Sequence, residues 1–409
     1  MARILVVGGS LGGLMAANML LRDGHDVRVL EKAEGSLDGR GAGIVTHRRL
    51  DEGLRRAGLP ADASLGVAVP GRVLLDAQGR AQVAKDLPQV LTSWSRLYHL
   101  LHDIFPRERY LQPVTVSEVQ ADESGVMVRH GSQELRADLL IASDGIRSAV
   151  RQQFAPQVQP QYAGYVAWRG VCDEAVLSQR ARETVFERFG FGLPAGEQLI
   201  GYPVAGPGHA LEVGRRSYNF VWYRPADEQQ LRELLTDADG QYYPQGIPPH
   251  KVAWRAVAAM REAARALLAP QFAEIMEKTA QPFLQAIYDV SSGRIAFGRV
   301  ALMGDASFVA RPHVGAGVTK AAEDAMALSD AIRAHGASPA ALAAYEQERL
   351  VVGQAIVERG RRLGAYLQAY SQGRRVPRSA QAEEDVVHET AIEMAGFTVD
   401  DLLSVRGAS

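Results

Sequence analysis

The first 31 residues constrain the fold more than any other stretch of the chain. Ile4–Val7 is a continuous apolar segment, which is typical of a buried parallel strand. Six residues, Gly8–Gly13, form a glycine-rich turn, and the helix predicted after them ends at Gly24. A second apolar strand, Asp26–Leu30, ends at Glu31. Strand, glycine turn, helix, strand and acid in this order predict a βαβ unit that binds a dinucleotide.

The glycine pattern departs from the usual fingerprint at one position. Gly8 and Gly13 occupy the first and third glycine positions, whereas Ser10 occupies the second, where the backbone approaches the pyrophosphate. Serine is small and can donate a hydrogen bond, so we expect the site to be retained. Glu31 is expected to bind the adenosine ribose and to disfavour a 2′-phosphate, although a solvated strand end would also explain it. Leu11 and Lys32 flank the same predicted site.

Two further apolar strands end in an acid and a glycine. Leu139–Ala142 leads to Asp144-Gly145, and Val300–Met303 leads to Gly304-Asp305, followed by a loop and a helix from about Thr319. A carboxylate here can accept hydrogen bonds from a polyol, and a helix start offers free N–H groups. The glycines of the loop allow a flat or anionic ligand to approach the backbone. A tight turn feeding a core helix is the alternative for this stretch.

Composition excludes several classes of function. A length of 409 residues suffices for two domains, and the net charge of −2 provides no field that would attract nucleic acid or an anionic membrane. The single cysteine, Cys172, precludes an intrachain disulfide and fits a reducing compartment. Neither a secretory signal nor a membrane-length apolar run is recognisable, so we expect a cytoplasmic protein. The ten histidines lack ligand spacing, so no metal site is predicted.

A change of character in mid-chain predicts a second, inserted domain. Aromatic-rich alternating strands between about Tyr162 and Val290 indicate a sheet with one covered face, and a nearby amphipathic helix is expected to end at Pro270. Ser338 and Pro339 predict the start of a long helix that runs to about Tyr370, followed by a loose tail with one short helix. The predicted division is a nucleotide-binding domain of 1–70, 95–160 and 291–372, a substrate domain of 71–94 and 161–290, and a tail of 373–409.

Three motifs in order carry a family resemblance. They are GGSLGG at 8–13, SDGIRSAVR at 143–151 and GDASFVARPHVGAG at 304–317. With these motifs the chain resembles the single-component FAD-dependent aromatic hydroxylases of the para-hydroxybenzoate hydroxylase type. The segments GRGAGIV, FPRERY, YAGYVAWRGV and ARPHVGAG are most similar to the dihydroxypyridine hydroxylases within that family. The resemblance implies an α/β fold: a glutathione-reductase-like FAD-binding domain with a parallel central sheet, a smaller β-sheet substrate domain and a long C-terminal helix.

The resemblance also implies a reaction. FAD would be bound without a covalent link, NAD(P)H would be the co-substrate, and a flavin hydroperoxide would pass one oxygen atom to an electron-rich hydroxylated ring such as a hydroxypyridine. Another oxygenase on the same fold, either an epoxidase or a Baeyer-Villiger enzyme, and a non-catalytic flavin-binding protein are the alternatives. The sequence leaves a monomer and a homodimer open.

Site residues follow from the resemblance by position. Asp305 would bind the ribityl chain, Asp144 would serve FAD and NAD(P)H, and Pro312 would face the flavin ring. The pyrimidine edge would lie along Gly315, Ala316, Gly317 and Val318, and the loop with Gly43 and Val45 would line the flavin from another direction. The chain departs from the family pattern at Phe308, Ala316, Thr319 and Trp94, where histidine, glutamine, asparagine and arginine are usual.

Two histidines are the candidates for the proton transfer that hydroxylation of a phenolic ring requires. His313 lies in the predicted flavin loop and His47 follows the GAGIVT segment, so the two could flank the substrate. Tyr202, Tyr223 and Arg169 lie on the predicted substrate sheet and are candidates for substrate binding. A packing role is the alternative for the tyrosines and a structural ion pair for the arginine.

Overall fold

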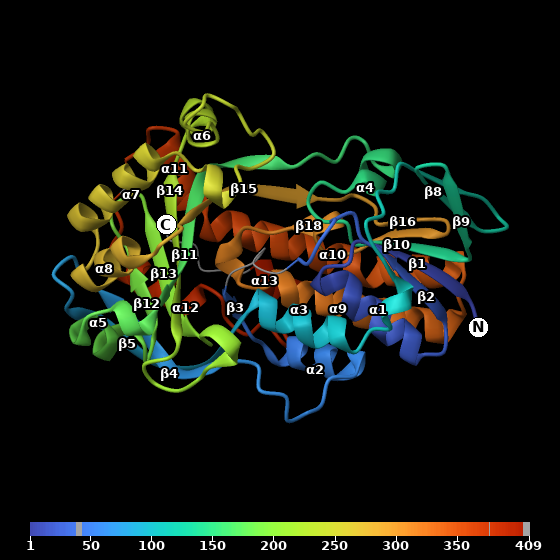
Figure 1. The fold of residues 1–409 in the computed structure, drawn as a ribbon, viewed down its shortest axis with the longest axis horizontal. Helices are drawn as coiled ribbons and strands as arrows, with labels where there is room; N and C mark the ends of the chain where they lie inside the picture. Colours follow the sequence, from blue (N-terminus) through green and yellow to red (C-terminus); the bar gives the residue numbers. More distant parts are fainter. Residues whose placement is uncertain (38–42, 376, 404–409) are drawn as a thin grey trace.

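The computed structural model describes residues 1–37, 43–375 and 377–403. Two large sheets lie at opposite ends of the long axis of the molecule, and the long helix α10 (Pro339–Leu363) crosses the middle between them (Figure 1). The predicted α/β architecture is confirmed. The sheet near the N-terminus carries the nucleotide fingerprint, and the sheet at the other end carries the aromatic-rich strands.

The first sheet has six strands in the order β16-β17-β10-β1-β2-β6. Five of them run parallel: β1 (Arg3–Val7), β2 (Asp26–Leu30), β6 (Tyr110–Leu111), β10 (Leu139–Ala142) and β17 (Val300–Leu302), whereas β16 (Ala296–Phe297) is antiparallel to β17. Val7 pairs with both Leu30 and Ala142, and Ala142 pairs with Leu302. The carboxyl ends of these strands are therefore level. This register brings Gly8, Glu31, Asp144 and Gly304 to one edge of the sheet, where ligands bind in open parallel sheets.

Helices and a small sheet cover this first sheet. Helix α9 (Gly317–His335) packs against α1 (Leu11–Arg22), α2 (Arg48–Ala57) and α10. The remaining cover comes from α3 (Trp94–Asp103), α4 (Ala149–Phe154) and an antiparallel sheet of β7 (Glu118–Ala121), β8 (Val126–His130) and β9 (Gln133–Ala137). The strands β1, β10 and β17 are apolar and almost entirely buried, as a parallel sheet with both faces covered requires.

The second sheet has nine strands in the order β18-β15-β11-β14-β13-β12-β4-β5-β3. Its strands are β3 (Gly43–Val45), β4 (Val67–Leu75), β5 (Ala81–Ser93), β11 (Gln161–Asp173), β12 (Phe189–Gly192), β13 (Gln198–Val204), β14 (Ser217–Pro225), β15 (Phe283–Ser291) and β18 (Phe308–Val309). Helices α5 (Gln179–Val185), α6 (Glu228–Leu234), α7 (Trp254–Leu267) and α8 (Pro270–Lys278) lie on its outer side (Figure 1). The amphipathic helix α7 stops at Leu267, shortly before Pro270, in line with the expectation that this proline limits it. Pro270 is also the first residue of α8, where its missing N–H is tolerated.

Both faces of the second sheet are covered, which corrects the expectation of one open face. Along β14, Tyr218, Phe220 and Trp222 pack in the cluster that contains α7 and α8. Val221 and Tyr223 point to the opposite face, where they share a cluster with C-terminal residues. The alternation expected of a strand is present, but chain segments far away in sequence supply the second cover.

The C-terminal part forms more structure than the sequence predicts. Ser338 caps α10 by accepting the N–H of Ala341 at 3.4 Å, as predicted. Three shorter helices follow: α11 (Ala365–Ser371), α12 (Ala380–Glu389) and α13 (Val399–Leu403). Val387 and Leu402 are buried, so residues 377–403 are packed against the protein. Within the described residues, no helix combines the length and the apolar content needed to cross a membrane.

Candidate active site

Three adjoining cavities form one continuous cleft between the two sheets. The first, of about 330 Å³, lies at the carboxyl edge of the first sheet and is lined by Gly8, Ser10, Glu31, Lys32 and Asp144. The second, of about 510 Å³, shares with it Ser10, Trp94, Ser143 and Gly145. The third, of about 250 Å³, shares with the second Gly43, Arg169, Asp305, Gly317 and Val318. A cleft that joins a nucleotide edge to a second sheet can hold an extended ligand.

Two glycines of the turn at the start of the cleft have no room for a side chain. Gly8 has a φ of +100°, and a Cβ there would lie 2.3 Å from the Ser143 carbonyl oxygen. A Cβ at Gly13 would lie 1.9 Å from the carbonyl oxygen of Gly8. Ser10 is the N-cap of α1, but its side chain makes no capping hydrogen bond, so its hydroxyl is available to a phosphate. Leu11 is buried and lines the second cavity beside it.

Glu31 is held in place by the backbone around it. Its carboxylate accepts the N–H of Gly9 and the N–H of Ala33, each at 2.8 Å, and the side chain is buried. A carboxylate oxygen has lone pairs for a second donor, so both oxygens can also accept a ribose hydroxyl. Lys32 is exposed at the rim of the same cavity. The geometry therefore suits the adenosine ribose of a dinucleotide.

Two aspartates line the cleft, and one of them has a buried oxygen without a partner. One oxygen of Asp144 accepts the N–H of Ala149 at 2.8 Å, whereas the other is buried without a hydrogen-bond partner, and burial raises the pKa of this carboxyl. Asp305 is exposed into the second and third cavities. Buried polar atoms without partners are uncommon in folded proteins. The unpartnered oxygen of Asp144 and the exposed carboxylate of Asp305 therefore fit a ligand with donor groups, such as the ribose and the ribityl chain of FAD.

A buried ionic cluster fixes the Gly304-Asp305 turn. Asp324 accepts the N–H of Gly304 at 3.0 Å, and Lys320 donates to the carbonyl of Gly304 at 2.8 Å and to Asp324 at 3.1 Å. Arg349 donates to the other oxygen of Asp324 at 2.8 Å. Burial alone would raise the pKa of Asp324, but Lys320 and Arg349 outweigh it and lower the pKa. Sequence reasoning missed this cluster, although its signal was present as a lysine and an aspartate four residues apart on an otherwise apolar helix face.

The third cavity is bounded by two short backbone segments that come from different parts of the chain. One is the flavin-side loop, residues 312–318, from which Pro312, Gly315, Ala316, Gly317 and Val318 line the cavity. The other is β3, from which Gly43 and Val45 line it. A Cβ at Gly43 would lie 2.4 Å from the ring of Tyr202, so the two are in direct contact. Residues 39–42 of the predicted glycine loop lie outside the described residues.

Three polar side chains of the second sheet reach the same cavity. Arg169 donates through Nη1 to Gln285 at 2.8 Å, whereas its Nε is buried and has no partner. Tyr202 and Tyr223 line the cavity beside it. Burial raises the pKa of Tyr202 to about 12 and also raises the pKa of Tyr223. Both phenols are therefore neutral at physiological pH and act as hydrogen-bond donors rather than as bases.

The two candidate histidines lie behind the cleft wall rather than on it. His313 is fully buried, its Nε2 lies 2.9 Å from the Tyr165 hydroxyl, and its ring packs against Tyr223 with centroids 4.3 Å apart. His47 is also buried, with its Nδ1 2.9 Å from the Thr319 hydroxyl, and it lines a separate cavity of about 620 Å³. This arrangement differs from the expectation that the two flank the substrate. Instead, His313 contacts Tyr165 and His47 contacts Thr319.

His313 predicts a dependence of stability on pH. Burial, aided by the charges of Arg311 and Arg378, lowers its pKa from 6.5 to about 3. Between these values the unfolded chain binds more protons than the folded chain, so acidification destabilises the fold by up to about 1.4 kcal/mol per pH unit. We expect His313→Gln to lose this contribution. Urea unfolding at about pH 7 and about pH 5 measures it. The exposed control variant His250→Gln should show the same change in unfolding free energy with pH as the wild type. If His313→Gln also showed the wild-type change, the assignment of this pH dependence to His313 would be contradicted.

Three departures from the family pattern have local explanations. Phe308 is buried, and a Cβ at Gly353 would lie 2.2 Å from its ring, so it serves as a packing residue. Thr319 contacts His47, as described above. Trp94 lines the first and second cavities, whereas the nearby Arg96 points away and donates to the carbonyl of Ser64.

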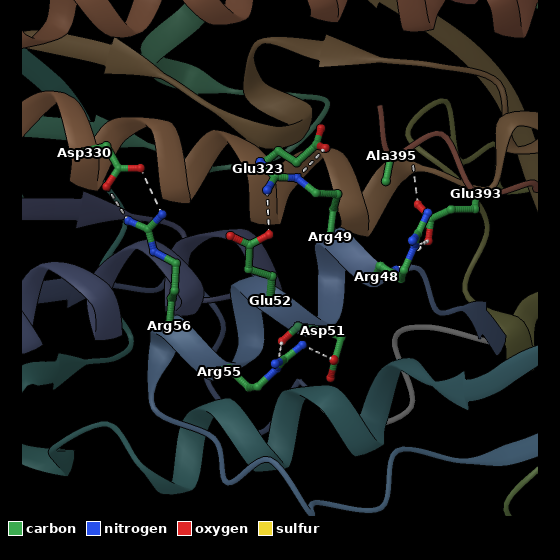
Figure 2. Close-up of polar contacts among 10 residues, drawn as sticks. All are labelled: Arg48, Arg49, Asp51, Glu52, Arg55, Arg56, Glu323, Asp330, Glu393 and Ala395. Atoms are coloured by element: carbon green, nitrogen blue, oxygen red, sulfur yellow. Dashed lines mark hydrogen bonds and ion pairs between the residues drawn. The ribbon is translucent and has the colours of Figure 1, made fainter. Parts of the chain in front are cut away.

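Helix α2 carries four arginines that could suggest an anion site. Figure 2 shows that each of them faces a carboxylate. Arg55 contacts Asp51 and Arg56 contacts Asp330; Arg49 contacts Glu52 and Glu323, and Arg48 lies near Glu393. These arginines therefore form a helix face of ion pairs rather than a free anion site. Among the residues that the structure describes, no group of three or more His, Cys, Asp or Glu side chains could hold a metal ion.

Comparison with known proteins places the chain in a family. The 2,6-dihydroxypyridine 3-monooxygenase of Paenarthrobacter nicotinovorans is 31% identical over 369 residues, which cover 90% of this chain and 91% of that protein. The chain belongs to the FAD-dependent aromatic hydroxylases. A family model described as FAD binding domain-like matches residues 162–289. The resemblance predicted from the three motifs is thus confirmed, and the protein is a monooxygenase with FAD as its cofactor and NAD(P)H as its co-substrate.

Two further comparisons support the assignment of this hydroxylase to the family. The solved structure of 2,6-dihydroxypyridine-3-hydroxylase from Arthrobacter nicotinovorans superimposes with a TM-score of 0.84 at 30% identity and covers 90% of this chain and 93% of that one. The 6-hydroxynicotinate 3-monooxygenase of Pseudomonas fluorescens is 26% identical and covers 85% of this chain and 87% of that protein. Both of these proteins are named for the hydroxylation of a hydroxylated nitrogen ring.

Proposed function

We propose that this hydroxylase inserts one oxygen atom into an electron-rich, hydroxylated nitrogen heterocycle such as a hydroxypyridine. The observation that supports this substrate class is the unpartnered, buried Nε of Arg169 at the end of the cleft, beside two neutral tyrosines. A guanidinium binds an ionised ring oxygen with a charge-assisted hydrogen bond, whereas neutral phenols donate to a ring oxygen or nitrogen. The names of the relatives point to the same class.

Each part of the cleft has a proposed role toward the cofactor. Gly8, Ser10, Leu11 and Gly13 would hold the pyrophosphate; Glu31 and Lys32 would contact the adenosine end, and Asp144 and Asp305 the ribose and ribityl hydroxyls. The ring would lie between Gly43 and Val45 on one side and the flavin-side loop, from Pro312 to Val318, on the other. Bound FAD supplies the redox chemistry and the activation of O2.

The protein's own contribution is to position and activate the substrate. Arg169 would stabilise the deprotonated ring hydroxyl and so lower its pKa, and Tyr202 and Tyr223 would orient the ring. Ile200, Val221 and Ile287 line the third cavity and would keep water from the reacting atoms. His313 and His47 would assist proton removal through their hydrogen-bonded neighbours, Tyr165 and Thr319.

A panel of hydroxypyridines and hydroxybenzoates tests the proposal. We expect a hydroxypyridine to stimulate NAD(P)H oxidation and to yield a product with one added oxygen. Arg169→Met should raise KM by roughly 10- to 100-fold, because a charge-assisted hydrogen bond contributes about 1.5–3 kcal/mol. Arg255→Met, which changes an exposed arginine on α7, is the matched control. Stimulation by hydroxybenzoates alone, or an unchanged KM in Arg169→Met, would refute the substrate class.

We also propose a cytoplasmic location and leave a monomer and a homodimer as outcomes of one measurement. A free, buried Cys172 and a need for NAD(P)H support the location. Light scattering of the purified protein distinguishes the two oligomeric states.

A further inference from the structure

The C-terminal strap, defined as residues 377–403, forms part of the wall of the cleft. The N–H of Ala391 donates to the carbonyl of His313 at 2.9 Å, and Ala391 lines the third cavity. A Cβ at Gly315 would lie 2.4 Å from the Cβ of Ala391, so the glycine is what allows this close approach. The flavin-side loop is therefore in contact with the strap on its outer side and with the cavity on its inner side.

The strap also connects the flavin-side loop to two helices. Leu402 is buried in a cluster with Val314, Ala316 and Ile356 of α10. Glu393 accepts the N–H of Arg48 at 2.5 Å, at the start of α2 (Figure 2). The loop is thus held by a segment that is distant in sequence: Ala391 and His313, which are hydrogen-bonded, lie more than 70 residues apart along the chain.

Arg72 of β4 anchors the strap from inside the protein. Its side chain is completely buried, and Nη1 donates to the carbonyls of Val387 and Thr390, each at 2.6 Å. Nη2 donates to the carbonyl of Ala391 at 3.0 Å, and Gln89 donates to that same carbonyl at 2.9 Å. These carbonyls lie at the end of α12, where the helix dipole favours a positive charge.

The anchoring contacts of Arg72 are all to neutral groups. Gln89 is its only side-chain hydrogen-bond partner among the described residues, and the rings of Phe189 and Phe191 lie 5.1 and 5.8 Å away. Burial lowers the pKa of Arg72 to about 10, so it remains charged at neutral pH. A buried cation without a carboxylate is costly, and the strap carbonyls provide most of its compensation. Arg72 and the end of α12 therefore depend on each other.

We propose that Arg72 is a positioning residue, which acts through the strap to hold the flavin-side loop against bound FAD. Arg72 fixes the carbonyls around Ala391, Ala391 fixes His313 and Gly315, and the loop then presents its backbone to the cofactor. Small displacements of groups that contact a cofactor have large effects on its binding and reaction. The proposal rests on the FAD cleft and not on the substrate, because the measurements below need no substrate.

Two measurements on Arg72→Met test the proposal. We expect the dissociation constant of FAD, measured by flavin fluorescence, to rise roughly tenfold. Hydrogen–deuterium exchange in the FAD-loaded protein should accelerate in peptides from 312–318 and 377–403 and remain unchanged in β1, β2 and β10. Arg72→Lys, which retains the charge, should recover part of both effects. A purely structural arginine would instead accelerate exchange throughout the second sheet.

Two more variants keep the test decisive. Lys85→Ala removes a contact to His388 on the exposed side of the same strap and should leave FAD affinity and loop exchange at wild-type values. Gln89→Ala removes the hydrogen bonds of Gln89 to Arg72 and to the Ala391 carbonyl but keeps Arg72 itself. We expect the dissociation constant of FAD to rise roughly threefold in this variant. If Arg72→Met is insoluble, Gln89→Ala decides alone. The proposal would be overturned if a folded Arg72→Met showed wild-type FAD affinity and wild-type loop exchange. If Arg72→Met is insoluble, the same result in Gln89→Ala would overturn it.

Discussion

Asp324→Ala is expected to lower the free energy of unfolding by about 3–5 kcal/mol, because it leaves two buried cations without their partner. Asp324, Lys320 and Arg349 are all almost completely buried. The substitution also removes the acceptor for the Gly304 N–H, so the turn that presents Asp305 should lose its fixed geometry. Chemical denaturation of the variant and the wild type measures the change. The difference in stability between the wild type and the variant should become smaller only at acidic pH. The pKa of Asp324 is lowered in the folded protein, so its stabilising contribution is present at neutral pH and is lost as pH falls.

The same helix provides the control. Asp330 lies six residues further along α9 and pairs with Arg56 at the surface (Figure 2). It also pairs with Arg333, and its side chain is half exposed. Exposed ion pairs contribute about 0–1 kcal/mol, so Asp330→Ala should have little effect. Equal destabilisation by the two substitutions would mean that the buried cluster does not hold the Gly304-Asp305 turn in the way described.

Glu31→Ala and Asp305→Ala are expected to weaken FAD binding by about 1–3 kcal/mol each, which corresponds to roughly 5- to 150-fold in the dissociation constant. Glu31 lines the first cavity and Asp305 the second and third, so each substitution should remove a hydrogen bond from a different part of the cofactor. Because they share no partner, the double variant should show about the sum of the two free energies. Equilibrium dialysis or flavin fluorescence measures the affinity.

A nearby glutamate controls for loss of charge in the same loop. Glu34 is exposed and lines none of the three cavities among the described residues, so Glu34→Ala should bind FAD as the wild type does. Full flavin occupancy in both Glu31→Ala and Asp305→Ala would show that these two positions are assigned wrongly.

Local sequence patterns were sufficient to predict which residues meet at the carboxyl edge of the first sheet. The fingerprint, the acid of Glu31 and the two acid-glycine turns each belong to a short strand-turn-helix unit, and parallel pairing of those strands brings them to one edge. The cap formed by Ser338 could be predicted because capping depends on residues that are neighbours in sequence. The helix near residue 384 was likewise predictable from a local pattern.

Features that depend on distant segments could not be predicted in this way. The contact of Ala391 with Gly315 and the three bonds from Arg72 to the strap join β4 and the flavin-side loop to the C-terminus, and no local periodicity indicates such contacts. The positions of His313 and His47 behind the cleft wall are a second example. Their place in the flavin loops suggested contact with the substrate, but the direction of each side chain was set by Tyr165 and Thr319 from other elements.

One measurement tests the central claim most directly, namely that this cleft performs FAD-dependent insertion of oxygen from O2 into a hydroxylated ring. The purified protein is incubated with NAD(P)H, the hydroxypyridine that best stimulates its oxidation, and isotopically labelled O2, and the product is analysed by mass spectrometry. We predict that the product carries one labelled oxygen atom. A product whose new oxygen comes from unlabelled water would contradict the claim.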